Sequence, residues 1–423
     1  MRRLIRRDGE TERVGGGAGV SEVAERLAEL RRAGLQRRLR LIEGPQGPRV
    51  LLDGAEVLLL CSNNYLGLAD HPRVRQAAAD AAERFGAGAG ASRLISGSMS
   101  LHRKLEDRLA KFKGSEAALL FGSGYLANTG TVATLAGRDG VVFSDELNHA
   151  SIIDGCRLSG AEKFIYRHLD LEHLEWGLRA AGRRSQLIVT DGVFSMDGDV
   201  APLAGLVELA RRHDCMLMVD DAHGTGAVGP GGRGSVAAAG LSGEVDVVVG
   251  TLGKALGGYG AYVCASGQLV ELLINTARPF IYSTAPPPPS VGAALAALSM
   301  LADRPGMVEQ LRRNAATLRE RLIGQGLETG GSRTQIVPVL VGDARRAMAL
   351  CERTLEGGVF AQAIRPPTVP AGSSRLRLTV MANHRAEELR HAAQVIGGAA
   401  RELGVAAAGD AQPGRARALR RAA

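Results

Sequence analysis

The chain is poor in cysteine, aromatic residues and, as shown below, lysine. Its five cysteines, Cys61, Cys156, Cys215, Cys264 and Cys351, are far apart and form no C-x-x-C pair. This pattern argues against a disulfide framework and a zinc site, and it favours a reducing, cytoplasmic location. Aromatic residues make up only 4% of the sequence, without the basic–aromatic interleaving that is typical of proteins that stack nucleic-acid bases.

Long apolar runs are also missing. No stretch of about 18 uncharged apolar residues occurs, which is the length a membrane-spanning helix needs. The most apolar candidate, residues 285–302, opens with four prolines, Pro286–Pro289. The N-terminus is basic but has no apolar segment behind its arginines, so we do not expect a signal peptide. The sequence therefore predicts no membrane partner.

The positive charge is confined to the two ends. The formal net charge is +8, and residues 1–49 and 410–423 together carry all of that excess. The neutral sequence between them argues against a nucleic-acid partner, because a binding face needs a basic patch on the folded domain. Solvated basic ends are the better interpretation.

Composition and apolar periodicity divide the chain into five segments. The ends are rich in Arg, Gly and Ala and are predicted to be disordered. The others are predicted to be an N-terminal helix with a small strand segment, a large ligand-binding domain and a small C-terminal α+β domain. In chain order, the segments are 1–20, 21–60, 61–290, 291–405 and 406–423.

Particular elements are predicted outside the large domain. Residues 21–41 have the period of an amphipathic helix, and residues 50–60 alternate like two strands around an Asp53-Gly54 turn. Residues 291–327 form a long helical stretch. Strand-like runs and a closing helix then follow, at 335–341, 360–364, 376–380 and 387–403.

Seven short apolar runs alternate with helical segments in the large domain. Near-continuous apolar strands separated by helices are typical of a mostly parallel sheet that is covered on both faces. The sequence therefore predicts an α/β fold. The seven runs are 117–121, 141–144, 163–166, 187–190, 215–219, 245–249 and 261–264.

Polar and glycine residues follow nearly every one of these runs. In open α/β sheets, ligands bind beyond the carboxyl ends of the strands, so these residues predict a composite site on one rim of the sheet. The segments concerned are 122–125, 145–151, 191–198, 220–223 and 250–254.

Lys254 is the most unusual of these residues. The chain has five lysines against 47 arginines, and Lys254 alone lies in an uncharged, glycine-rich segment after an apolar strand. Arginine cannot replace lysine where a neutral amine must attack a carbonyl. We therefore favour Schiff-base chemistry over an incidental surface lysine.

A Schiff-base lysine in an α/β protein suggests pyridoxal phosphate (PLP). Asp220 is placed to keep the pyridine nitrogen protonated, although the same position suits a turn aspartate. Gly124-Tyr125 opens a helix whose N-terminus can bind a phosphate, and Thr251 adds a hydroxyl. His149 could stack on the ring and move protons, although alone it is more often a structural histidine.

A dinucleotide-binding site is the competing interpretation. Gly122-x-Gly124-x-x-Ala127 follows a strand and opens a helix, and Asp145 ends the next strand, as in an NAD-dependent oxidoreductase. This fingerprint is weak and does not account for Lys254. A catalytically inactive relative that serves as a binding partner is a third possibility.

Six sequence motifs occur in order along the chain. They are SNNYLGL at 62–68, SRLISG at 92–97, NHAS at 148–151, DGVFSMDG at 191–198, VDDAHG at 219–224 and TLGKALG at 251–257. Together they resemble the α-oxoamine synthases, which are fold-type-I PLP-dependent enzymes. The resemblance covers residues 21–405 and implies a large domain with a seven-stranded sheet and a small C-terminal domain.

The resemblance assigns roles residue by residue. The catalytic residues would be Lys254, which bonds to the cofactor, Asp220 at its ring nitrogen and His149, which stacks on the ring and contacts substrate. Of the other cofactor-binding residues, Ser195 and His223 would lie near the phenolic oxygen of the cofactor, and Gly124, Tyr125 and Thr251 would lie near its phosphate. Ser283 and Thr284 would reach the phosphate bound by a neighbouring subunit, which implies a homodimer. The other substrate-binding residues would be Arg365 at the amino-acid carboxylate, Thr368 and Arg37.

The resemblance also implies a reaction. Members of the family condense an amino acid with an acyl thioester and release carbon dioxide. The segments 280–284 (FIYST) and 363–372 (AIRPPTVPAG) are most similar to members that use L-alanine and pimeloyl-CoA or pimeloyl-acyl carrier protein in biotin biosynthesis. The nearest alternative within the family joins glycine to acetyl-CoA.

Overall fold

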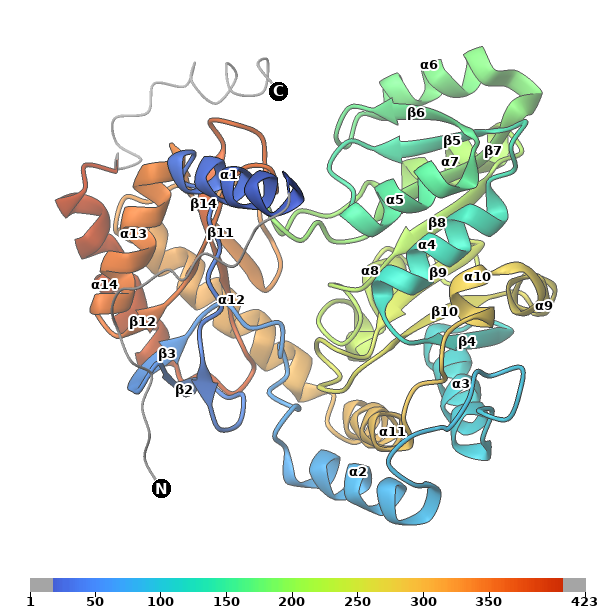
Figure 1. The fold of residues 1–423 in the computed structure, drawn as a ribbon, viewed down its shortest axis with the longest axis horizontal. Helices are drawn as coiled ribbons and strands as arrows, with labels where there is room; N and C mark the ends of the chain where they lie inside the picture. Colours follow the sequence, from blue (N-terminus) through green and yellow to red (C-terminus); the bar gives the residue numbers. More distant parts are fainter. Residues whose placement is uncertain (1–17, 406–423) are drawn as a thin grey trace. The chain divides into compact units, whose positions relative to one another are not determined.

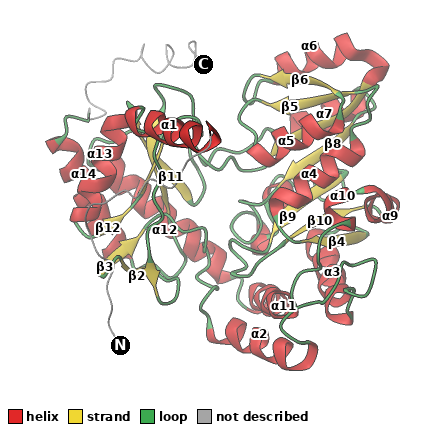
Figure 2. Ribbon diagram, in the orientation of Figure 1, coloured by secondary structure: helices red, strands yellow, loops and turns green. Residues whose placement is uncertain are grey.

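The structure, a computed structural model, describes residues 18–405 (Figures 1 and 2). The disorder predicted for residues 1–20 and 406–423 lies outside the described residues, except at residues 18–20, where the prediction is wrong because these residues begin a helix. The chain has two compact parts, one that ends at Leu41 and one that begins at Ile42. Among residues 18–405, no helix has both the length and the apolar character required to cross a bilayer.

The first part holds one helix, α1 (Ala18–Arg32). The prediction of a helix over 21–41 is wrong at its C-terminal end. Gly34 adopts φ 65°, in the left-handed region, and the Leu35 N–H donates to the Leu30 carbonyl at 2.8 Å. A left-handed glycine and a hydrogen bond that reaches back five residues terminate a helix.

The second part contains the predicted seven-stranded sheet. Its strand order is β4-β10-β9-β8-β7-β5-β6, and only β10 runs antiparallel to its neighbours. All seven predicted strands are present, so the prediction of a mostly parallel α/β sheet is confirmed. The strands are β4 (Ala117–Phe121), β5 (Val141–Asp145), β6 (Glu162–Tyr166), β7 (Ser185–Asp191), β8 (Met216–Asp220), β9 (Val247–Thr251) and β10 (Ala261–Ala265).

Both faces of this sheet are buried, which explains why its strands are apolar throughout. On β7, Leu187 and Val189 pack in one apolar cluster, whereas Ile188 packs in another, because successive side chains of a strand point to opposite faces. The helices of this region are α2 (Pro72–Phe85), α3 (Ser100–Lys113), α4 (Gly124–Leu135), α5 (Ala150–Ser159), α6 (Leu171–Ala181), α7 (Leu203–Arg212), α8 (Ser235–Ala238), α9 (Gly267–Thr276) and α10 (Arg278–Ile281).

Two smaller sheets combine strands of the C-terminal segment with strands from residues 42–59. One has the order β11-β14-β13, and the other has the order β1-β2-β3-β12. Since β3 pairs in parallel with β12, residues 42–59 join the C-terminal segment. The Asp53-Gly54 turn links β2 to β3, and both residues have positive φ, as a tight hairpin turn requires. The strands are β1 (Ile42–Glu43), β2 (Arg49–Leu52), β3 (Ala55–Leu59), β11 (Ile336–Gly342), β12 (Val359–Phe360), β13 (Gln362–Ile364) and β14 (Ser374–Thr379).

The predicted helical stretch over 291–327 is two helices, α11 (Pro288–Asp303) and α12 (Gly306–Gly324). Arg304 leaves the helical region, because the ring of Pro305 disfavours helical backbone in the residue before it. α11 packs against α2 and α3, whereas α12 packs against β11 and the closing helix α14 (Ala386–Glu402). A further helix, α13 (Ala344–Glu356), was not predicted.

Candidate active site

Four parallel strands end in polar residues at one edge of the large sheet. β5 ends at Asp145, β7 at Asp191, β8 at Asp220 and β9 at Thr251. Asp191 and Asp220 are paired across β7 and β8. The carboxyl ends of parallel strands meet at the same edge, so these residues and the loops after them form one rim, where a ligand site was predicted.

Lys254 lies three residues after β9. Its Nζ is 2.9 Å from Nε2 of His223. Burial lowers the pKa of Lys254 to about 8, although the nearby carboxylates of Asp220 and Asp191 act in the opposite direction. A sizeable fraction of this amine is therefore neutral near pH 8, which is the form that attacks a carbonyl.

His223 connects Lys254 to two residues from distant segments. Its Nδ1 is 2.7 Å from the hydroxyl of Tyr65, and Arg377 Nη2 donates to the same hydroxyl at 3.4 Å. Burial lowers the pKa of His223 well below its usual range, and the positive charges of Lys254 and Arg377 lower it further. The imidazole is therefore neutral near pH 7 and can exchange a hydrogen bond with Lys254.

Asp220 and Asp191 place two buried carboxyl groups on the rim. Asp220 Oδ1 accepts the N–H of Ala222 at 2.9 Å, and Oδ2 accepts the side-chain amide of Asn128 at 2.6 Å. Burial raises the pKa of Asp191 well above its usual range, and the negative charge of Asp220 adds to this effect. The raised pKa of Asp191 reduces the net negative charge that accumulates at this edge.

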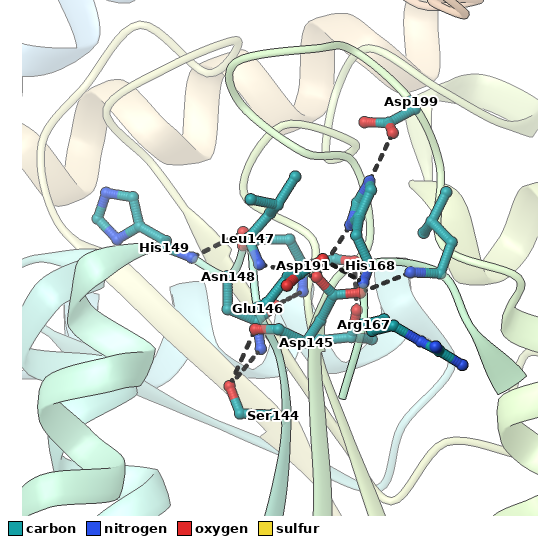
Figure 3. A network of polar contacts seen from close by, with 12 residues as sticks. Ser144, Asp145, Glu146, Leu147, Asn148, His149, Arg167, His168, Asp191 and Asp199 are labelled. Atoms are coloured by element: carbon teal, nitrogen blue, oxygen red, sulfur yellow. Dashed lines mark hydrogen bonds and ion pairs between the residues drawn. The ribbon is translucent and has the colours of Figure 1, made fainter. Parts of the chain in front are cut away.

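His149 caps the first turn of α5, and Asp191 fixes its main chain. The His149 N–H donates to Asp191 Oδ2 at 2.9 Å (Figure 3), and His149 as a whole is an exposed residue. Desolvation by the surrounding protein lowers the pKa of His149, Asp220 raises it and the charge of Lys254 lowers it. An exposed, neutral imidazole at this point offers a flat face to a ligand.

A second histidine ties the rim loops together (Figure 3). His168 is paired to Asp145 through Nδ1 at 2.9 Å and to Asp199 through Nε2 at 2.8 Å. These contacts outweigh the effect of burial and raise the pKa of His168 to about 10. A charged His168 thus holds the end of β5 against the loop that carries Ser195.

The predicted phosphate-binding residues lie at the start of α4 and the end of β9. Ser123 caps α4, and its Oγ accepts the Leu126 N–H at 3.3 Å, so Gly124 and Tyr125 form the first turn. The Tyr125 hydroxyl donates to Asp154 at 2.5 Å. Thr251 is buried, and its Oγ1 accepts the Gly253 N–H at 3.1 Å.

The remaining predicted residues come from four other segments. The Ser195 carbonyl accepts a hydrogen bond from Arg377. Ser283 and Thr284 lie between α10 and α11, where Thr284 is bridged to Ser92. Arg365 and Thr368 flank a cis Pro366-Pro367 bond after β13. Arg37 belongs to the part of the chain that ends at Leu41, whereas Lys254 belongs to the part that begins at Ile42, so the role of Arg37 as a substrate contact stays a prediction.

Sequence reasoning missed three residues that contact the candidate site. Tyr65 lies inside the 62–68 motif but was given no role, and Asn128 looks like an ordinary helix residue. Arg377 carried a usable signal, because it lies inside the strand-like run 376–380, and a charged residue that a strand buries requires a specific partner.

Lys113 also has an unusual environment, although the sequence singles out Lys254 alone among the five lysines. The sequence places it at the end of a charged helix, but its side chain is 4% exposed and its Nζ lies 2.6 Å from Asp221, which is 0% exposed. The same Nζ donates to the Arg233 carbonyl at 2.8 Å. Lys254 is therefore not the only lysine outside an ordinary surface role.

We expect Lys113→Met to destabilise the fold by about 3–5 kcal/mol, because it leaves the buried Asp221 carboxylate without its cation. Urea unfolding measures this. Lys104→Met, on the exposed face of the same helix α3, is the matched control and should stay within about 0.5 kcal/mol of the wild type. Equal stability of the two variants would contradict the importance of this ion pair.

Comparison with known proteins shows the family of the chain. The chain belongs to the aminotransferase class I and II family, whose sequence pattern matches residues 55–396. It is 55% identical over 388 residues to the 8-amino-7-oxononanoate synthase of Geobacter sulfurreducens, covering 90% of this chain and 99% of that protein. It is 50% identical to the protein of that name from Symbiobacterium thermophilum, covering 90% of this chain and 98% of that protein.

Solved structures agree on the fold. Serine palmitoyltransferase from Sphingomonas wittichii superposes with a TM-score of 0.86 at 34% identity, covering 91% of this chain and 98% of that one. The 8-amino-7-oxononanoate synthase of Francisella tularensis superposes with a TM-score of 0.71 at 29% identity, covering 82% and 98%. The predicted fold-type-I PLP-dependent transferase architecture and the resemblance to α-oxoamine synthases are thus confirmed. These comparisons do not support the oxidoreductase alternative.

Proposed function

We propose that the chain is a PLP-dependent acyltransferase that condenses L-alanine with a pimeloyl thioester and releases carbon dioxide, the 8-amino-7-oxononanoate synthase reaction of biotin biosynthesis. The observation that carries this proposal is the Lys254 amine, whose pKa is lowered to about 8 by burial and whose Nζ lies 2.9 Å from His223 at the rim. Relatives of that name at 50–55% identity support the choice of substrates.

The residues on the rim fit PLP in their chemistry. Lys254 offers a partly neutral amine to the aldehyde, and Asp220 offers a carboxylate that two donors hold in place. At Gly124, an added Cβ would meet nothing within 4 Å, so the start of α4 has open space for a phosphate. In the proposal, Tyr125 and Thr251 complete the phosphate site.

When bound, PLP would supply an electron sink that stabilises negative charge at the α-carbon of the amino acid. Asp220 would keep the ring nitrogen protonated through its carboxylate. His149 would cover one face of the ring, and Ser195 and His223 would bind near its phenolic oxygen. Lys254 Nζ, once free, would take the α-proton and return a proton to the product.

Two arginines are candidates for the amino-acid carboxylate. Arg365 has the family resemblance in its favour, with Thr368 and Arg37 as further substrate contacts. Arg377 has position in its favour, because its guanidinium reaches the Tyr65 hydroxyl that contacts His223. A guanidinium can bind a carboxylate through two parallel hydrogen bonds, so either residue could fix the orientation of alanine.

The proposal includes a cytoplasmic homodimer. Ser283 and Thr284 would reach the phosphate site of the other subunit. Tyr282 beside them is 72% exposed and Ile95 on the facing 92–97 segment is 80% exposed, which is consistent with an apolar contact surface there.

Steady-state assays with matched substrate pairs test the reaction. We expect kcat/KM to be highest for L-alanine with a pimeloyl thioester and at least about tenfold lower for glycine with acetyl-CoA, because one methylene-sized difference in a pocket changes binding by about 1–3 kcal/mol. Pimeloyl-CoA and pimeloyl-acyl carrier protein are compared in the same assay to identify the donor. A preference for glycine with acetyl-CoA would overturn the assignment.

A further inference from the structure

A series of buried side chains links His149 to Asp220 through two helices of the rim. The side-chain nitrogen of Asn128, on α4, donates to Asp220 Oδ2 at 2.6 Å and to Ser151 Oγ at 2.8 Å. Ser151, on α5, places the same Oγ 2.7 Å from His149 Nδ1. Asn128 is 1% exposed and Ser151 is 0% exposed, so water does not compete for the two contacts that Asn128 makes.

The direction of each hydrogen bond in this series is fixed. The two N–H groups of Asn128 serve Asp220 and Ser151, while its Oδ1 is buried and has no partner among the described residues. The opposite orientation of the amide would set that oxygen against the Asp220 carboxylate. Ser151 Oγ therefore accepts from Asn128, which leaves its own hydrogen to donate to His149.

The backbone confirms the acceptor role of His149 Nδ1. The Ser151 N–H donates to this nitrogen at 3.3 Å, as the capping contact of α5. A backbone N–H cannot act as an acceptor, so Nδ1 carries no proton and the proton of the neutral ring is on Nε2. Two donors therefore face Nδ1, and the closer of them, the Ser151 hydroxyl, leads back through Asn128 to Asp220.

Close packing of the two helices makes the series possible. Gly155 lies one turn after Ser151 on α5, and a Cβ at that position would be 2.9 Å from the Val132 Cβ and 3.1 Å from the Asn128 carbonyl. A side chain at position 155 would push α5 away from α4. The missing side chain lets Ser151 reach Asn128.

We propose that Asn128 and Ser151 are positioning residues that couple the ring of His149 to the carboxylate of Asp220. The inference rests on the proposed function, in which these two groups contact one cofactor ring from its face and its edge. Asn128 orients the carboxylate, and Ser151 holds the imidazole in one plane and one tautomer. The His149 imidazole and the Asp220 carboxylate are then oriented by the same series of hydrogen bonds, so a change in the orientation of one alters the other.

The test uses the full chain without added cofactor, labelled with ¹⁵N-histidine. The His149 resonances are assigned with His149→Gln, and its tautomer and pH titration are read by NMR. In the wild type, we expect the proton on Nε2 at neutral pH. Asn128→Ala should raise the population of the Nδ1–H form, because the Ser151 hydroxyl can then accept from Nδ1 and only the longer backbone contact, at 3.3 Å, still favours Nε2–H. The charges near the ring, on Asp220, Lys254 and Asp191, stay the same.

Matched variants separate this role from a general structural one. Ser151→Ala should shift the tautomer as Asn128→Ala does, Ser151→Thr should restore it, and the double variant should shift it no further than either single variant. Thr129→Ala, also on α4 and bonded only to backbone carbonyls of its own helix, is the control. If urea titrations show that Asn128→Ala does not fold, the comparison of Ser151→Ala with Ser151→Thr is sufficient to test the proposal.

Kinetics of the loaded enzyme add a second measurement. We expect Asn128→Ala and Ser151→Ala to lower kcat about tenfold with little change in KM for L-alanine, the size of one lost hydrogen bond. If His149 has the same tautomer and titration in all variants while the wild type condenses alanine, the coupling is wrong and the proposed function stands. If no condensation occurs but the tautomer shifts, the coupling stands and the function is wrong.

Discussion

We expect Lys254→Ala to abolish turnover with L-alanine and pimeloyl-CoA. Loss of a positioned base alone lowers a rate by about 10²–10⁴-fold, and this substitution also removes the amine that bonds to the cofactor. Steady-state kinetics measure the loss. PLP is expected to bind still, without a covalent bond, because Asp220, His149 and the start of α4 are unchanged.

Two further variants sharpen this result. Lys254→Arg keeps a positive charge but cannot supply a neutral amine, so it should be as inactive as Lys254→Ala. Lys163→Ala, at an exposed position on β6, should have normal activity. Borohydride treatment of the wild type with PLP, followed by peptide mapping, should attach the pyridoxyl group to Lys254. Substantial activity of Lys254→Ala, or labelling at another lysine, would overturn the proposed function.

Asp220→Asn is expected to lower kcat by about 10²–10³-fold, comparable to the loss of other preorganised electrostatic groups. The carboxylate accepts two N–H donors, from Ala222 and from Asn128, and the asparagine amide would place a third donor against one of them. The neutral amide also cannot hold the proton on the ring nitrogen. The measurement is kcat and KM for both substrates, together with the affinity for PLP.

The control for this variant is Asp303→Asn, which changes an exposed carboxylate paired with Arg73 on α2. It should leave kcat unchanged, because exposed ion pairs have small energies and this one lies in another segment of the chain. A kcat for Asp220→Asn that is close to the wild-type value would contradict the role of Asp220 as the partner of the ring nitrogen.

Much of the large sheet could be predicted because each strand carries its own signal. β4, for example, was predicted with its observed bounds, since its apolar run is followed at once by Gly122 and a helix cap at Ser123. Helix ends and domain limits were less predictable. α1 stops at a left-handed Gly34, and residues 42–59 pair with a strand three hundred residues later, which no local pattern indicates.

The residues of the candidate site likewise fall into those that the sequence predicted and those that it did not. Lys254, Asp220, His149 and His223 stand out because each follows a strand whose carboxyl end must lie on the rim. Tyr65, Asn128 and Arg377 could not be found, because they come from a loop, a helix interior and a strand of the small sheet. Only folding brings them within hydrogen-bond distance of the rim residues.

The sequence by itself determined the α/β class, the sheet edge that carries polar residues and the identity of Lys254 as its unusual amine, since all three follow from local order along the chain. The tertiary structure decided the lowered pKa of Lys254, the tautomer of His149 and the burial of Lys113 against Asp221. These properties depend on desolvation and on partners that are distant in sequence, and such partners are fixed only when the helices and sheets pack together.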